Sequence, residues 1–82
     1  MKRHKGIYVV WLDSAGTNGW CLPDDVENAG TPMRCETLGF FVRETQNAIV
    51  VALNFSNAPR TARPYGELIT IPKCAVVTRR WV

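Results

Sequence analysis

The sequence predicts an all-β fold, a small and partly open barrel of five antiparallel strands with one long loop carrying at most a helical turn. Short apolar blocks rich in β-branched and aromatic residues recur along the chain, a pattern typical of strands. Clusters of glycine, proline, asparagine and serine separate these blocks and predict turns. Gly39, inside the apolar block at residues 38–42, predicts the bulge or bend that a small barrel needs at a corner.

The chain is organised around residues 34–55, RCETLGFFVRETQNAIVVALNF. The polar segment 45–47 predicts a tight turn, because asparagine tolerates left-handed backbone. The run on either side therefore reads as a hairpin, and each of its strands must bury one apolar face. Counting every second residue, we expect the core to contain Leu38, Phe40, Val42, Ile49, Val51 and Leu53.

The remaining strands are expected at residues 7–12, 67–71 and 74–82, with a short turn at Pro72-Lys73 because proline cannot donate to a sheet ladder. The first of them is apolar on both faces, as expected for a strand inside the sheet or one covered by a long loop. Residues 1–5 are expected to form a flexible tail, and residues 1–82 a single domain.

Two loops flank the central hairpin. The longer one, residues 14–33, includes the segment 23–27, which has a proline followed by acids and predicts one helical turn. Trp20 in this loop either plugs one end of the barrel or stacks on a ligand. The second loop, residues 56–65, carries two prolines and two arginines.

The net charge of +3 is unevenly distributed, because four of the seven acids fall between residues 13 and 27. We expect an acidic loop on an otherwise basic molecule. No apolar run approaches the roughly 20 residues that would span a membrane, and no secretory signal is expected, because no small-residue cleavage site follows the basic N-terminus.

Metal and cofactor sites are not expected. The three cysteines, Cys21, Cys35 and Cys74, lack C-x-x-C spacing, and the one histidine, His4, lies in the tail, whereas structural zinc takes four nitrogen or sulfur ligands. Half-buried thiols in a reducing cytoplasm explain the cysteines, and a Cys21–Cys35 disulfide is the alternative.

Catalysis is not expected either. A nucleophile needs an adjacent base that a third group orients, and neither Ser14 nor the cysteines have a histidine near them in the predicted fold. Binding is better supported, because the arginine fork matches phosphate. Arg60 and Arg63 on a loop ending in Tyr65, with Trp20 as a second stacking surface, form the predicted ligand-binding site for an anion. The alternative is that the two arginines are ordinary solvated loop charges.

The segment GFFVRETQNAIVVAL, followed by ITIPK, resembles the strand order of the SH3-like and Sm-like small barrels over residues 37–80. In the Sm-like family a loop Asp and Asn contact RNA, and a later Arg-Gly pair completes the site. Asn47 matches the Asn. Glu44-Thr45 stands in place of the Asp and Pro72-Lys73-Cys74 replaces the Arg-Gly region, so the resemblance implies the barrel rather than the RNA site.

The whole chain is similar to a group of short bacteriophage and prophage proteins. The similarity rests on Val9, Trp11 and Asp13-Ser14, on the loop residue Trp20, on TLGFFVRET and on the late IPK. It implies an accessory protein that works in the cytoplasm of a bacterial host.

Three hypotheses about function follow. The chain could bind or sequester an anionic ligand, a signalling nucleotide or nucleic acid, and so counter host defence. It could instead inhibit a host protein through exposed residues such as Trp20 and Trp81, since tryptophan is enriched at interface hot spots. Finally, it could form a homo-oligomer through its C-terminal edge strand.

Overall fold

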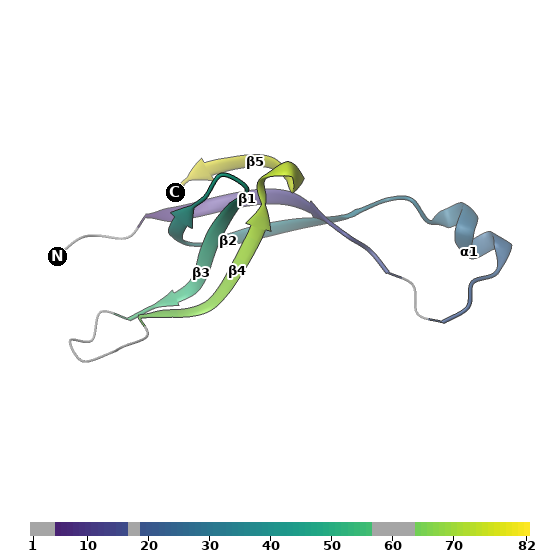
Figure 1. The fold of residues 1–82 in the computed structure, drawn as a ribbon, viewed down its shortest axis with the longest axis horizontal. Helices are drawn as coiled ribbons and strands as arrows, with labels where there is room; N and C mark the ends of the chain where they lie inside the picture. Colours follow the sequence, from purple (N-terminus) through teal and green to yellow (C-terminus); the bar gives the residue numbers. More distant parts are fainter. Residues whose placement is uncertain (1–4, 17–18, 57–63) are drawn as a thin grey trace.

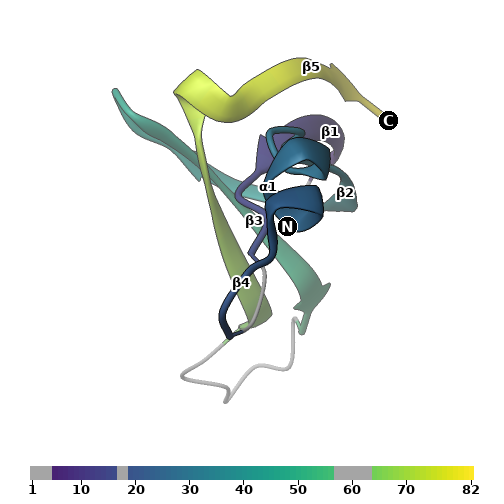
Figure 2. The same ribbon diagram turned by 90° about the vertical axis from the view of Figure 1, so that its right-hand side faces the viewer.

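The computed structural model describes residues 5–16, 19–56 and 64–82. Its five strands form one antiparallel sheet that does not close into a barrel (Figures 1 and 2). The strands lie in the order β4-β3-β2-β1-β5. The elements are β1 (Gly6–Asp13), α1 (Pro23–Asn28), β2 (Met33–Glu44), β3 (Ala48–Phe55), β4 (Tyr65–Pro72), the 3-10 turn η1 (Lys73–Ala75) and β5 (Val76–Trp81). The predicted small all-β fold and its partly open sheet are confirmed.

β2 belongs to two halves of the sheet and changes its partner midway. Its residues from Met33 to Phe40 pair with β1, whereas those from Phe40 to Glu44 pair with β3. The two halves therefore share little of β2, and the sheet curves strongly. In Figure 2, β4 and β5 meet at η1 and run in clearly different directions. Such curvature lets a single sheet enclose its own core.

Gly39 lies where β2 changes partner, but the bulge predicted at this glycine is at Val42. The register between β2 and β3 shifts between Phe41 and Arg43. At Gly39 the backbone of β3 comes very close, because a Cβ atom there would lie 2.5 Å from the carbonyl oxygen of Ala52. Glycine is thus required for close approach of two strands.

The core fills the concave face of the curved sheet. Its buried side chains come from β1, β3 and β4, and half-buried residues of β2 and of the segment from η1 to β5 pack against them. The buried members are Ile7, Val9, Trp11, Ile49, Val51 and Ile71. Burial of one such side chain contributes about 1.5–3 kcal/mol, so this small cluster is the main source of stability.

The expected core of the hairpin was half wrong. Ile49 and Val51 are buried, but Leu38 and Leu53 are each 62% exposed, and Phe40 and Val42 are only half-buried. In β2 the reason is that alternation defines two faces without saying which one is covered. Leu53 shares the face of Ile49 and Val51 on β3, and it is exposed because it lines an open hollow.

In β2 the opposite face is inward, and small residues there make room for Trp11. The indole Nε1–H of Trp11 donates to Thr37 Oγ1 at 2.9 Å, and Cys35 packs against the same core. Leu38 therefore lies on the convex face, which no other layer of the described residues covers, whereas Phe41, beyond the change of partner, packs against the core.

An ion-pair clamp, defined as Glu44 with Arg79 and Lys73, ties the end of β2 to β5 and η1. Arg79 Nη1 donates to Glu44 Oε1 at 2.8 Å, and Lys73 Nζ lies 2.7 Å from Glu44 Oε2. The Lys73 backbone N–H also donates to the carbonyl of Asn47, at 2.8 Å. These bonds span the open side of the sheet, where no ladder between described strands joins β4 to β5.

Between β1 and β2 the chain leaves the sheet as an arm, defined as residues 14–16 and 19–32 and carrying α1 near its tip (Figure 1). The molecule is 57 Å long and only 25 Å across. The predicted helical turn is confirmed as α1, which begins with Pro23 and ends with the Ala29 N–H donating to Val26 O. The Asp25 carboxylate accepts the Leu22 N–H at 2.9 Å, as acids do at helix starts.

All three cysteines are free thiols, so the Cys21–Cys35 disulfide does not form. Cys35 is half-buried as expected, but Cys21 and Cys74 are exposed. Within the described residues, no helix has the length and apolar character needed to cross a membrane.

Candidate binding surfaces

The predicted ligand-binding residues are not brought together in the part of the chain that the structure describes. Trp20 belongs to the arm, whereas Tyr65 opens β4 at the far side of the sheet (Figure 1). The Tyr65 ring packs on Phe55 with centroids 5.5 Å apart. Arg60 and Arg63 lie outside the described residues.

Trp20 does not plug the barrel, because its relative exposure is 102%. It begins an arm surface, which we define as Trp20, Leu22 and Val26 together with the acids of α1. Leu22 and Val26 are 71% and 65% exposed, and no residue of α1 is buried. Isolated helices this short are unstable in water. The arm surface thus combines exposed apolar side chains with acids on a helix that does not pack on the sheet.

The outer face of the sheet carries a row of paired charges across β5, β1 and β2. The Arg80 guanidinium lies 5.2 Å from the Tyr8 ring centroid, and the Tyr8 hydroxyl donates to Glu36. Glu36 also accepts from Arg34 at 3.0 Å. The Tyr8 hydroxyl and the Arg34 guanidinium lower the pKa of Glu36, while the bond to Glu36 raises the pKa of Tyr8. Since Glu36 offsets these cations, the row is a weak site for an anion.

Trp81, the other predicted anchor, is 53% exposed but has partners within the chain. Its ring packs edge-on against Phe41 at 5.1 Å, and Lys5 Nζ lies 5.2 Å from its centroid. It extends the core at the edge of β5 rather than standing free, which distinguishes it from Trp20.

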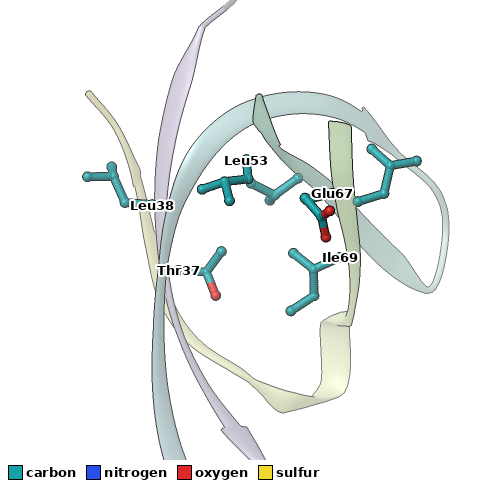
Figure 3. Close-up of a pocket in the computed structure, with 7 residues that line it drawn as sticks. Thr37, Leu38, Leu53, Glu67 and Ile69 are labelled. Carbon is teal, nitrogen blue, oxygen red and sulfur yellow. The ribbon is translucent and has the colours of Figure 1, made fainter. Parts of the chain in front are cut away.

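A hollow that we call the mouth pocket opens where β3 and β4 diverge from the first half of β2 (Figure 3). Its volume is about 260 Å³. Thr37 points into it from β2, Glu67 and Ile69 point into it from β4, and Leu38 lies on the outer side of β2. The described residues that line it are Thr37, Leu38, Val51, Leu53, Glu67, Leu68 and Ile69.

Among the described residues that line the mouth pocket, Glu67 alone is charged, and it has an unusual backbone. Its φ of 57° is left-handed, which is uncommon for a residue with a side chain. The β3–β4 ladder pairs Ala52 with Leu68 and Asn54 with Gly66, and skips Leu53 and Glu67 between them. No hydrogen bond or ion pair engages the Glu67 carboxylate within the described residues.

Other hollows offer less chemistry. One of about 270 Å³ lies over Ile49, and its charges belong to the ion-pair clamp. The clamp already satisfies them, and Arg79 and Lys73 lower the pKa of Glu44 to about 2. Another hollow lies between the two sides of the arm and is lined by small, uncharged residues.

The described residues contain no group of three or more His, Cys, Asp or Glu side chains placed to hold a metal. None of the buried residues among them is polar or charged. No protein-family model, curated protein or solved structure matches the chain.

Sequence reasoning did not find the mouth pocket. Its residues come from β2, β3 and β4, so their proximity depends on how far β3 diverges from β2. The nearest signal was the Gly66-Glu67 pair, because glycine next to a charged residue inside a strand indicates an irregular ladder.

Proposed function

We propose that this chain is a non-enzymatic binding protein that engages a partner protein through the arm surface. The observation that carries the proposal is the exposure of Trp20, Leu22 and Val26. They lie on an arm whose helix α1 has no buried residue. Exposed apolar groups gathered on a projecting element mark interaction sites, and tryptophan is a frequent interface anchor.

The energy available from this surface is large enough for specific binding. A tryptophan side chain buries about 150–250 Å², which corresponds to roughly 4–6 kcal/mol at 25 cal/mol per Å². Leu22 and Val26 add to this gross value, and the costs of association reduce it. The acids Asp24, Asp25 and Glu27 surround these side chains, and they favour a partner with a basic rim.

The similarity to short phage proteins supports a host protein as the partner. In this proposal the chain is an accessory protein in the bacterial cytoplasm that inhibits a host component, including one that acts in defence. The sheet is then the scaffold and the arm the inhibitory element.

The test starts from protein purified from its bacterial host. Native mass spectrometry identifies the retained partner, and calorimetry measures the affinity of the purified pair. We expect Trp20→Ala with Leu22→Ala to weaken binding at least 100-fold, by about 2.7 kcal/mol or more. Val77→Ala, on β5 and also exposed, is the matched control and leaves the affinity unchanged. Unchanged binding by the double variant contradicts the proposal.

Salt separates this proposal from the second candidate, an anionic ligand held by Arg60, Arg63 and Tyr65. That candidate is supported by the aromatic pair of Tyr65 with Phe55 at the base of the arginine-bearing segment. Binding of a nucleic acid weakens steeply as salt increases, and Arg60→Ala with Arg63→Ala would abolish it without unfolding the chain. Apolar binding through the arm changes little with salt.

A homo-oligomer remains the third candidate, because β4 and β5 are the edge strands of the sheet and edges pair readily with other strands. Light scattering at working concentration decides this, and a monomer removes it.

A further inference from the structure

We propose a second protein-binding site, separate from the arm: the mouth pocket takes a lysine or arginine side chain from an extended segment of a partner protein, which pairs with the open edge of β2. The occupant is a basic peptide segment in β conformation. The inference does not depend on the arm surface and goes beyond the function proposed above.

The open edge follows from the directions in which the backbone N–H and C=O groups of β2 point. The Phe41 N–H donates to the Lys5 carbonyl at 2.8 Å, so the odd-numbered residues of β2 turn their backbone groups toward β1. Hydrogen-bonded and non-bonded pairs alternate in antiparallel ladders. The even-numbered residues Arg34, Glu36 and Leu38 therefore turn theirs the other way, toward β3.

β3 does not reach those residues. Its ladder with β2 begins at the Phe40–Ala52 pair and continues only toward Glu44. Arg34, Glu36 and Leu38 are all exposed, and no strand described in the structure pairs with this side of them. Three residues with unpaired backbone groups on one edge form a template for one added strand.

The mouth pocket beside this edge has the chemistry of a site for a long cationic side chain. Its walls are mainly aliphatic, from Val51, Leu53 and Ile69, and Glu67 adds one unpaired carboxylate. Lysine and arginine bury an apolar stem while their charged head seeks a polar partner. A volume of about 260 Å³ suits one side chain and lies below the range of pockets for drug-sized ligands.

The backbone at Glu67 supports a role in binding. Its left-handed φ of 57° and the gap in the β3–β4 ladder occur at the same residue. A left-handed backbone is unfavourable for any residue with a Cβ atom, and residues in this conformation cluster at binding sites. The negative charge of Glu67 favours a basic occupant of the mouth pocket and disfavours an anion.

The test uses a blocked heptapeptide, acetyl-Lys-Thr-Val-Lys-Val-Thr-Lys-amide, and the full chain. In an added strand its central lysine and two threonines share one face. When this face lies on the same side of the sheet as Thr37, the central lysine enters the pocket. A second peptide has norleucine at that position and keeps the four-carbon stem without the charge. Binding is followed by calorimetry, and amide exchange by NMR.

We expect the lysine peptide to bind at millimolar concentration or better. Both Glu67→Gln and the norleucine replacement should weaken binding about two- to fivefold, the effect of one partly exposed ion pair. Asp13→Asn removes the same charge from the exposed end of β1, outside both the mouth pocket and the arm surface, and should have no effect. The amides of Arg34, Glu36 and Leu38 should exchange freely before the peptide is added and become protected in the complex.

Three outcomes overturn the inference: no binding at millimolar peptide, equal affinity of Glu67→Gln and Asp13→Asn, or binding without protection of those three amides. None of them bears on the arm, because the proposed function is tested by Trp20→Ala with Leu22→Ala. The two proposals therefore fail separately.

Discussion

Replacing Gly39 by alanine tests how closely the two halves of the sheet approach. The new Cβ would lie 2.5 Å from the Ala52 carbonyl oxygen and 2.8 Å from a Val51 methyl group, whereas ordinary contacts begin at 3.4 Å. The backbone of β3 must therefore move by about 0.9 Å, the difference between 3.4 and 2.5 Å. Overpacking of this kind costs about 1–3 kcal/mol, a large part of the roughly 4–12 kcal/mol expected for a chain of this size.

Urea denaturation followed by circular dichroism measures this cost. With a slope of about 1–2 kcal/mol per M, the unfolding midpoint of Gly39→Ala should fall by roughly 0.5–3 M. Gly16→Ala is the control, because a Cβ there meets nothing within 4 Å, and its free energy of unfolding should stay within about 0.5 kcal/mol of the parent. If the two variants unfold at the same midpoint, β2 and β3 do not approach as described.

The ion-pair clamp, the core face and the Glu67 backbone each give a further prediction. Because Arg79 and Lys73 lower the pKa of Glu44 from 4.5 to about 2, its carboxylate stabilises the fold above pH 4.5. This contribution disappears as the pH falls toward 2, so the stability gap between the parent and Glu44→Gln should narrow over that range in acid denaturation. Ile49→Ala should cost about 2–5 kcal/mol, and Leu38→Ala at most about 0.5 kcal/mol; similar urea midpoints would disprove the face assignment. Glu67→Gly should be about 1 kcal/mol more stable than Glu67→Ala, and the reverse order would contradict the left-handed backbone.

The strands could be predicted because they depend on local pattern. Residues 45–47 form the turn between β2 and β3, and Pro72 ends β4, as the turn chemistry of these residues indicates. The five strands and the helical turn after Pro23 needed no long-range information.

The buried face of β2 and the positions of the candidate binding residues could not be predicted, because they depend on how the whole sheet curves and where the arm points. Leu38 has the same alternating pattern as a core residue, yet it lies on the convex face because Trp11 fills the concave one beside Thr37. The position of Trp20 depends on whether residues 14–33 fold back over the sheet or project from it, and no local residue preference decides that. The arm projects, so Trp20 is exposed instead of buried.

The central claim is that the sheet is an independent scaffold and the arm is the part that binds. Asp13 and Met33 are opposite each other in the β1–β2 ladder, so an Asn-Gly turn can join them directly in place of residues 14–32. Paired unfolding and calorimetric measurements on this variant test the claim most directly. We predict that the free energy of unfolding stays within about 1 kcal/mol of the parent, because α1 buries no residue, while binding to the partner protein is lost. A variant that fails to fold, or one that still binds the partner as tightly as the parent, would contradict the claim.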